Sequence, residues 1–501
     1  MGKTFSKPFL KVWLALLLNA LLPSLGFAAP SAFGEGVRIG QSTKDLLKQA
    51  WAQATLDKND ETIQRGLSLA RNHWRALEEN WPEQLERIRG IAQGSGIDLD
   101  ELGLISMFFT KFNCAQSASA PPATKDGAVY LSWNLDLVNI AKPLFALPLL
   151  SVTSPEGGYK TLVLGIPYVL GIGLMNEKGL SLAGASITVS DSGEGLTPFE
   201  LSLLIMERCR SVKEAVNLLE TVPRFSTDDY FWGNFTNWSY SLADADGGIG
   251  TVEFTSHAIA SAYGDNGILA RANCYDYLPE ELTTCSPENP MFGGPSDAFA
   301  AFGSMAREAR MYELLRLHYG SLTLKDIQSF TADTNGGKPF LGKDSGSWWT
   351  IERHTHTIQE EISQPLGSPY VPLLDDLLQV STTVGFVMEP KQRTLWVSLG
   401  HPGEVPYLPV DLGKLVGQNT NGTIEMATQR NAARLVNVWV SFLTKAFANA
   451  RSLGGAYSAI GQELENLGLP RLTGQLLVDS MNLLDLYDIL NPSPNHPEEG
   501  E

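Results

Sequence analysis

A cysteine stands at the start of a strand-turn-strand pattern whose return strand ends in polar side chains. Cys114 is followed by small and polar residues, an Asp-Gly turn at 126–127, and a strand that ends with Asn134 and Asp136. Asp-Gly is typical of a hairpin turn. Counting outward from the turn places Cys114 beside the end of the return strand, so a thiol and a carboxylate meet at one end of a sheet. Because a free cysteine is usually a small apolar core residue, this spacing alone leaves a nucleophile and a core thiol both open.

Helices are predicted ahead of the cysteine. Ser42 begins a capping-box pattern, and apolar residues recur at spacings of three and four over 63–77, which is typical of an amphipathic helix. Another helix is predicted to begin at Pro82 and to end in the glycine-containing stretch 94–96. The chain is therefore predicted to be helical up to about residue 105.

Short strands dominate after residue 108. They are predicted over 128–135, 161–164, 169–175, 180–187, 238–242, 249–254, 347–351, 382–388 and 394–399. Helices are predicted from Pro198, from Ser211 and over 297–317. Antiparallel strands with helices between them imply an α+β layered sandwich. The pattern becomes helical again after Pro402, near 427–448, 459–467 and 474–490.

The N-terminus has the pattern of a secretory signal. Three lysines precede the apolar run 12–22, and small residues follow at 26 and 28. Residues 1–28 are predicted to be a cleaved signal peptide, which implies a secreted or periplasmic protein. The apolar run is too short for a membrane span of about 20 residues, so no transmembrane anchor is expected.

The composition excludes some classes of protein. The 501 residues include 37 Lys and Arg against 55 Asp and Glu, a formal charge of −18. Nucleic-acid binding requires cationic surface, so no nucleic-acid partner is expected. A hydrophobic share of 43% predicts a well-cored globular protein rather than a disordered one.

Several motifs follow the cysteine in a fixed order. They are Gly173-Leu-Met-Asn-Glu-Lys-Gly-Leu180, the strand and turn over 238–247, Ala272-Asn273, and Ser304-Met-Ala-Arg-Glu-Ala-Arg310. Together they resemble the N-terminal-nucleophile (Ntn) hydrolases of the choloylglycine hydrolase and penicillin acylase group. The related acyl-coenzyme A:6-aminopenicillanic acid acyltransferase family looks nearer, because its members carry a helical segment similar to 85–100. The resemblance covers about residues 80–405.

The resemblance implies a four-layer αββα sandwich that is made as an inactive precursor. The chain is expected to break itself between Asn113 and Cys114, giving a helical pro-segment (29–113, the α chain) and a hydrolase domain (114–410, the β chain) as a processed α/β heterodimer. Residues 411–501 would form a C-terminal helical extension with an acidic tail. No cofactor is expected, because an α-amine with a pKa of about 7.7 to 8 can accept the thiol proton.

The family's functional residues match four positions of this chain. Cys114 matches the nucleophile, Asp136 the aspartate that positions the amine or nucleophile, and Asn273 an asparagine that helps to line the oxyanion site. Arg307 matches an arginine near the nucleophile, and Arg310, one helical turn away, is the competing choice. Each also has a structural interpretation as a turn, loop or helix-surface residue, so only the joint order favours function.

The chain departs from the choloylglycine pattern at three positions. Trp133 stands where an arginine precedes the Asn-x-Asp element, Ser186 replaces a second oxyanion asparagine, and Asn113 replaces a small residue before the scissile bond. The changes at Trp133 and Ser186 put bile-salt substrates in doubt, and Asn113 leaves self-cleavage as a prediction. Further candidates are Asn134, Asn176 and Ser186 for oxyanion or positioning contacts, and Trp133 and Trp232 for the walls of a substrate pocket.

Other clusters give weaker signals. Cys274 and Cys285 are close enough in sequence to pair in an oxidising compartment, and Cys209 is interpreted as a buried core thiol. His354 and His356 share one face of a strand, which can be half of a zinc site, but no further ligands are visible nearby. A solvated strand face is the favoured interpretation, and no metal is expected.

Three functions are consistent with these observations. The leading hypothesis is an exported, self-activating cysteine hydrolase or acyltransferase that acts on a small-molecule linear amide, an N-acyl compound. The second is an ester or phospholipid hydrolase on the same scaffold, motivated by the apolar stretch 140–152, which is interpreted as a loop or pocket wall. The third is a non-catalytic binding protein that keeps the fold, motivated by Trp133, Ser186 and Asn113.

Overall fold

The computed structural model describes residues 31–55, 59–108, 113–138, 150–226, 236–279, 282, 295–333, 380–398, 402 and 407–418. Several predictions lie outside these residues: the signal peptide, Trp232, Cys285, the strand at 347–351, His354, His356 and the C-terminal helices after 418.

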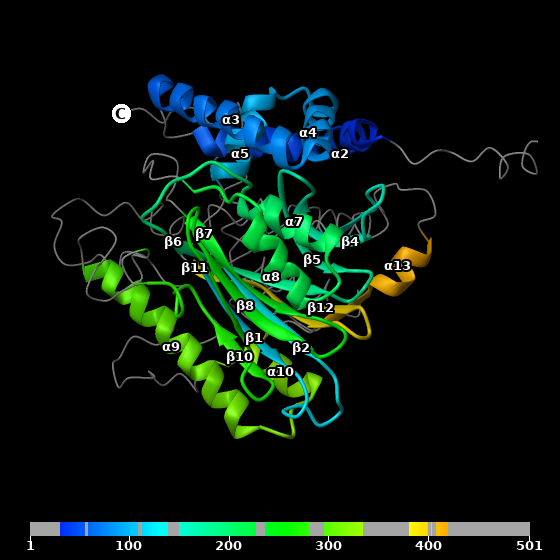
Figure 1. The fold of residues 1–501 in the computed structure, drawn as a ribbon, viewed down its shortest axis with the longest axis vertical. Helices are drawn as coiled ribbons and strands as arrows, with labels where there is room; N and C mark the ends of the chain where they lie inside the picture. The colour runs from blue at the N-terminus through cyan, green and yellow to red at the C-terminus, as the bar shows by residue number, and fades with distance from the viewer. Residues whose placement is uncertain are drawn as a thin grey trace, which may run out of the picture.

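The described chain contains helices and antiparallel strands (Figure 1). The helices are α2 (Ala32–Thr55), α3 (Asp60–Asn80), α4 (Pro82–Ser95), α5 (Leu99–Phe108), α7 (Pro198–Arg208), α8 (Val212–Thr221), α9 (Pro295–Leu317), α10 (Leu324–Thr331) and α13 (Leu412–Gln418). The strands are β1 (Asn113–Ser119), β2 (Tyr130–Val138), β3 (Leu150–Thr153), β4 (Thr161–Ile166), β5 (Leu170–Asn176), β6 (Ser181–Thr188), β7 (Thr236–Ala243), β8 (Ile249–Phe254), β9 (Ile259–Tyr263), β10 (Ile268–Arg271), β11 (Val380–Glu389), β12 (Thr394–Ser398) and β13 (Leu408–Asp411).

The N-terminal helices α2–α5 form a unit of their own at one end of the molecule (Figure 1). As predicted, α4 begins at Pro82 and ends before Gly96, which has a φ of 73°. The prediction that a helix starts at Ser42 was wrong. Its hydroxyl donates to the carbonyl of Ile39 inside α2 at 2.9 Å, so this serine bonds back within a helix that begins at Ala32.

Glycines allow α2 and α4 to pack closely. A Cβ at Gly36 would lie 1.9 Å from the carbonyl oxygen of Arg87, and one at Gly90 would lie 2.2 Å from that of Phe33. Gly40 and Gly94 face the partner helix in the same way, so each helix contributes a pair of glycines four residues apart. Because residues four apart lie on one helix face, the two glycine faces bring the backbones into contact.

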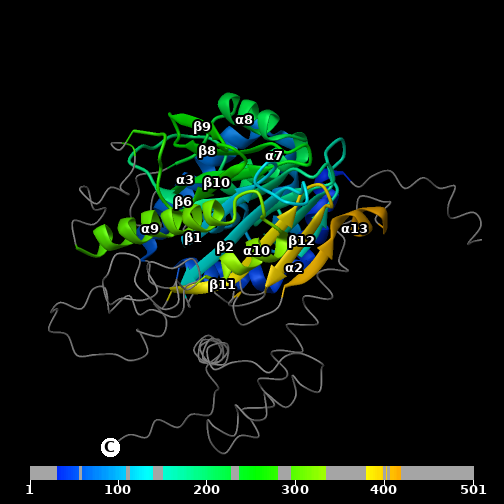
Figure 2. The same cartoon turned by 90° about the horizontal axis from the view of Figure 1, so that it is seen from below.

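Two antiparallel sheets form the centre of the fold. The first has the order β10-β1-β2-β11-β12-β13, and the second has the order β3-β4-β5-β6-β7-β8-β9. The sheets face each other, with β1 and β2 against β6 and β7. Helices α9 and α10 cover the first sheet, and α7 and α8 cover the second (Figure 2).

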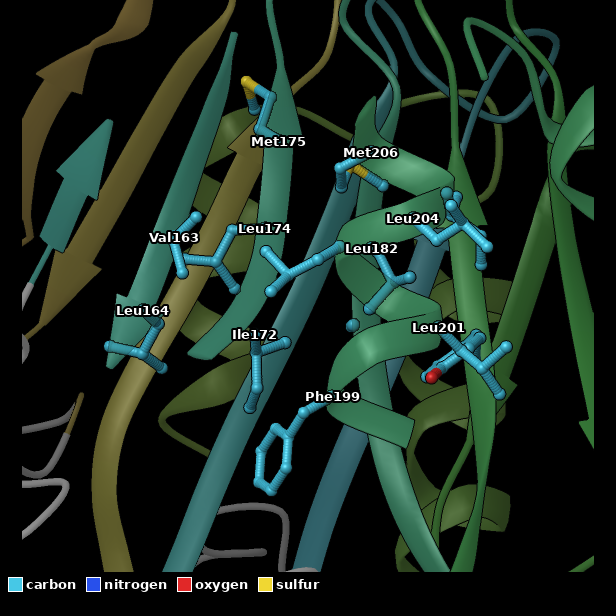
Figure 3. Packing of buried hydrophobic residues seen from close by; sticks show 14 of the residues in the cluster. Val163, Leu164, Ile172, Leu174, Met175, Leu182, Phe199, Leu201, Leu204 and Met206 are labelled. Carbon is cyan, nitrogen blue, oxygen red and sulfur yellow. The ribbon is translucent and has the colours of Figure 1, made fainter. Parts of the chain in front are cut away.

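The second sheet packs tightly against α7. Thr197 and Glu200 form the predicted capping box at the start of this helix. Figure 3 shows apolar side chains of α7, such as Phe199 and Leu204, beside those of β5 and β6, such as Ile172 and Leu182.

The predicted mixed fold with antiparallel sheets is confirmed, and most predicted strands fall where expected. The structure adds α10, β9, β10 and β13, which the sequence interpretation missed. The expectation of helix directly after Pro402 was wrong at 408–411, because these residues pair with β12 as strand β13. The interpretation of 140–152 as a loop was wrong at its end, because Leu150–Thr153 pairs with β4 as strand β3; residues 140–149 lie outside the described part. No helix in the described ranges has the length and apolar character needed to cross a membrane.

Candidate active site

The hairpin of β1 and β2 sets the position of the cysteine. Cys114 pairs with Leu135, Ala115 with Asn134, and Asn113 with Asp136. The thiol residue therefore lies beside the end of the return strand, as the count from the turn predicted. Cys114 is fully buried.

The same register separates the thiol from the carboxylate. Cys114 belongs to the core between the two sheets, whereas Ala115 packs with residues of α9 and α10 on the other face. Since side chains alternate along a strand and paired residues share a face, Asp136 lies on the helix-covered face. Its position opposite Asn113 places it beside the peptide bond between Asn113 and Cys114.

Asn273 holds the backbone of Cys114. Its Oδ1 accepts a hydrogen bond from the N–H of Cys114 at 2.8 Å and another from Nη2 of Arg307 at 2.9 Å. Its Nδ2 donates to the carbonyl of Ser186 at 2.9 Å. Two donors on one side and an acceptor on the other fix the orientation of the amide. In the unbroken chain, Asn273 therefore presents its oxygen, not its nitrogen, to Cys114.

Arg307 brings a buried positive charge to the backbone of Cys114. Besides its bond to Asn273, Nη2 donates to the carbonyl oxygen of Cys114 at 3.3 Å. Arg310, the competing choice, instead forms a two-pronged ion pair with Asp333 at 2.8 and 2.9 Å. The structure therefore places Arg307, rather than Arg310, against Cys114.

Two hydroxyl residues that the sequence interpretation missed support this arrangement. Ser304 Oγ accepts a hydrogen bond from the N–H of Asn273 at 2.6 Å, and Thr382 Oγ1 donates to Oδ1 of Asp136 at 2.7 Å. Both hydroxyl residues are buried. Ser304 lies one helical turn before Arg307 on α9, so both side chains share a helix face. The motif over 304–310 therefore contained the signal that could have identified Ser304. Thr382 has no such signal, because only the pairing of β11 with β2 brings it to Asp136.

The additional asparagine candidates have structural partners. Asn134 Nδ2 donates to the carbonyl of Thr331 at 2.8 Å and ties β2 to α10. Asn176 Nδ2 donates to the carbonyls of Met206 and Cys209, and its Oδ1 accepts from backbone N–H groups in the turn after β5. Asn176 ends β5 and holds the turn that leads to Ser181 at the start of β6, whereas Ser186 lies five residues further along β6, roughly 16 Å from that end of the strand. Asn176 therefore stabilises a turn that lies away from Cys114.

The other candidate positions contribute backbone or packing contacts. Ser186 meets Asn273 through its carbonyl, and its side chain shares a sheet face with Trp238, its partner in register. Trp133 is buried in the sheet beside Phe386, with ring centroids 5.6 Å apart. Its position is opposite Gln116, two residues after Cys114.

The remaining cysteines fit structural roles. Cys274, next to Asn273, is disulfide-bonded, while its predicted partner Cys285 lies outside the described residues. Cys209 is free and buried, and burial raises the pKa of its thiol to about 12, which confirms a core thiol. Within the described ranges, no group of three or more His, Cys, Asp or Glu residues could hold a metal ion.

Comparison with known proteins gives matches among solved structures only. No protein-family model and no curated protein matches the sequence. Penicillin V acylase from Agrobacterium tumefaciens is 14% identical, with a TM-score of 0.34 over 62% of this chain and 90% of that chain. A mutant of the conjugated bile acid hydrolase from Clostridium perfringens is 16% identical, with a TM-score of 0.35 over 62% of this chain and 95% of that chain.

Proposed function

We propose that this protein is an exported Ntn hydrolase with a four-layer αββα core, which breaks its own chain before Cys114 and then cleaves or transfers the acyl group of a linear, non-peptide amide. The observation that carries the proposal is the buried contact of Cys114 with Asn273 and Arg307 at the start of β1. A core thiol needs neither an asparagine on its N–H nor a guanidinium on its carbonyl.

The self-cleavage step uses the peptide bond that these residues hold. The thiol of Cys114 adds to the carbonyl carbon of Asn113, the bond to the Cys114 nitrogen breaks, and that nitrogen takes up the thiol proton. Water then hydrolyses the thioester, leaving a carboxylate on Asn113 and a free thiol and α-amine on Cys114. Asn273 fixes the leaving nitrogen through its N–H, and Asp136 lies across from Asn113, where a carboxylate can relay the proton.

Turnover of a substrate then needs no further base. The new α-amine accepts the thiol proton, and the thiolate attacks the substrate amide carbonyl. The substrate's nitrogen leaves with a proton, and water or an acceptor amine releases the acyl group from sulfur. Arg307 disfavours a second positive charge on the α-amine, because like charges repel, and so keeps that amine available as a base.

The proposed substrate is a small N-acyl amide, and the proposed working form is an α/β heterodimer in a secreted or periplasmic compartment. No described contact favours the ester or phospholipid alternative, since residues 150–152 of its motivating stretch form part of β3. That alternative and a non-catalytic binding protein become outcomes of the test.

The test compares the wild-type chain with Cys114→Ala on a denaturing gel and determines the N-terminus of any fragment by mass spectrometry. We expect a wild-type fragment that begins at Cys114 and is absent from the variant. Cys209→Ala is the matched control, because it removes the other free buried thiol of the described residues and should leave cleavage intact. The processed protein is then assayed on an N-acyl amide and on the matched ester. Turnover of the ester alone, or no cleavage and no turnover in folded wild type, would overturn the proposal.

A further inference from the structure

Two of the buried polar contacts between the N-terminal helices and the rest of the described chain contain titratable side chains. The first, here called the charge cluster, consists of Glu35, Arg87, Tyr168 and Glu207. The second, here called the histidine contact, consists of His73 with Glu200 and the carbonyl of Gly195. Both join α2–α5 to α7 and the segments next to it, which lie directly below these helices in Figure 1.

The charge cluster places one guanidinium between two carboxylates. Arg87 on α4 lies 3.1 Å from Glu35 on α2 and 3.7 Å from Glu207 on α7, measured from its nitrogens to their carboxylate oxygens. Its Cζ lies 4.8 Å from the ring centroid of Tyr168, whose hydroxyl donates to Glu207 at 2.9 Å. The side chains of all three charged residues are at most 5% exposed.

The charge cluster contains two carboxyl groups but only one guanidinium. With both carboxylates ionised, Arg87 leaves a buried net charge of −1, and one bound proton removes it. Burial is the main reason that the pKa of Glu207 rises to about 7; Arg87 opposes the rise and Glu35 adds to it. Two further arginines oppose these rises: Arg38 on α2 lowers the pKa of Glu35, and Arg208 at the end of α7 lowers the pKa of Glu207.

The histidine contact also favours a bound proton. Nε2 of His73 lies 3.0 Å from Oε1 of Glu200, and Nδ1 lies 3.0 Å from the carbonyl oxygen of Gly195. Both ring nitrogens face acceptors, so only the doubly protonated imidazolium can donate to both. Burial alone would lower the pKa of His73, but Glu200 and then Gly195 outweigh it, and the pKa is raised. The rings of Trp74 and Phe225 complete the surroundings of this side chain.

We propose that residues 31–108 are held on the core by a proton-dependent latch, made of the charge cluster and the histidine contact, that grips in mildly acidic solution and loosens in alkaline solution. The proposal rests on the proposed function in one respect: after cleavage before Cys114, the latch decides whether the helical segment stays bound. In the uncut chain it decides how often this segment detaches locally.

The direction of the pH dependence follows from where each proton is bound. Attached Glu207 keeps its proton up to about pH 7, whereas the detached residue loses it near its ordinary pKa of 4.5, so attachment weakens as the pH rises between these values. Attached His73 has a raised pKa, so its contribution is complete below about pH 6.5 and is lost as the pH rises through that raised value. Both contacts therefore weaken in the same direction.

The first experiment uses the uncut chain, so that it does not depend on self-cleavage. Hydrogen exchange of peptides from α2–α5 is measured at pH 5.5 and 8.5 in the Cys114→Ala protein, corrected for intrinsic exchange and referenced to β7 and β8. We expect opening to become more frequent at pH 8.5 by about tenfold or more. Adding Glu207→Gln to the Cys114→Ala protein mimics the protonated acid. This double variant should exchange more slowly at pH 8.5 and so lose most of the difference between the two pH values.

Two further variants sharpen the result. His73→Gln cannot carry the charge and should speed exchange at pH 5.5 while changing it little at pH 8.5. Glu214→Gln is the matched control, because this carboxylate on α8 forms an exposed ion pair with Arg210 and should leave the pH difference unchanged. Equal opening at both pH values in the Cys114→Ala protein, or a Glu207→Gln protein that keeps the full difference, would overturn the latch.

The second experiment uses the wild-type protein after cleavage. Native mass spectrometry should show the helical fragment bound at pH 5.5 and released at pH 8.5, with release suppressed by Glu207→Gln. If the wild-type chain never cleaves but exchange in the Cys114→Ala protein depends on pH as expected, the proposed function fails and the latch stands. If cleavage occurs and the fragment binds equally at both pH values, the latch fails and the proposed function stands.

Discussion

The side-chain oxygen of Asn273 accepts a hydrogen bond from the backbone N–H of Cys114 at 2.8 Å, although 159 positions separate them in the chain. The nitrogen of that N–H belongs to the peptide bond that the proposed self-cleavage would break. An asparagine expected to stabilise an oxyanion is thus oriented, in the unbroken chain, to hold the leaving nitrogen. After cleavage the same oxygen can receive a proton of the α-amine and direct the nitrogen's lone pair.

This relationship predicts that Asn273→Ala slows self-cleavage strongly. The variant removes the acceptor for Cys114 and one partner of Arg307, and we expect a loss of about 100-fold or more, as for other preorganised active-site contacts. The rate of fragment formation on a gel measures it. Asn176→Ala is the control, because it breaks turn contacts and should lower the melting temperature without slowing cleavage in the folded fraction. Equal rates for Asn273→Ala and wild type would refute the role.

A second prediction separates the two arginines of α9. Arg307→Lys replaces the guanidinium, whose Nη2 bonds to both Asn273 and Cys114, with a shorter side chain that ends in a tetrahedral ammonium, so we expect kcat/KM on an amide to fall by about tenfold to 100-fold. Arg310→Lys loses its two-pronged contact with Asp333, in which both side chains are mostly buried, and should cost about 1–3 kcal/mol of stability with kcat/KM unchanged. Steady-state kinetics and urea unfolding of both variants provide the comparison; the reverse pattern would assign the role to Arg310.

The sequence predicts best what depends on neighbouring residues. The capping box at Thr197, the end of α4 before Gly96 and the hairpin register of Cys114 all follow from local patterns, and each is found. Ser42 was misassigned, since a serine with the pattern of a cap can equally bond back inside a helix.

Local sequence patterns could not predict the contacts between segments that are distant in the chain. Thr382 meets Asp136 only because β11 lies next to β2, and Arg87 meets Glu207 only because α4 lies on α7. No spacing in the sequence encodes either approach. The order of the motifs identified Asn273 and Arg307 as candidates. The orientation of the Asn273 amide could be assigned only from its hydrogen-bond partners in the folded structure.

A third prediction concerns Thr382 as a positioning residue for Asp136. Thr382→Val removes the hydroxyl at nearly constant shape, leaving a buried carboxylate with one hydrogen bond fewer. We expect kcat to fall with little change in KM and the pH profile of kcat to move, whereas Thr382→Ser, which keeps the hydroxyl, should restore both. A merely structural role predicts instead a loss of stability, of about 1–3 kcal/mol, with an unchanged pH profile.

A fourth prediction tests the close packing of α2 and α4. Gly90→Ala would place a methyl group 2.2 Å from the carbonyl oxygen of Phe33, so the helices must separate, at a cost of about 1–3 kcal/mol. Gly96→Ala is the control: its Cβ meets nothing within 4 Å, so only its φ of 73° should cost free energy, about 1 kcal/mol. Hydrogen exchange in α2 separates them, since only Gly90→Ala should loosen that helix.

A fifth prediction concerns Gln116, which is fully buried two residues after Cys114. Within the described part of the chain, neither its Oε1 nor its Nε2 has a hydrogen-bond partner. An unsatisfied buried amide costs about 1–3 kcal/mol, and methionine has a similar shape without that cost. Gln116→Met should therefore stabilise the protein by an amount in that range, measured by urea unfolding of the Cys114→Ala chain.

The matched change for this test is Gln84→Met. Gln84 is an equally buried glutamine on α4. Its Oε1 also has no hydrogen-bond partner in the described part of the chain, but its Nε2 donates to the carbonyl of Tyr168 at 3.2 Å. Replacing it removes a real hydrogen bond and leaves that carbonyl without this donor, so this variant should be destabilised. A loss of stability in both variants would mean that Gln116 is also bonded in solution, and the polar position beside Cys114 would then contribute to the fold instead of weakening it.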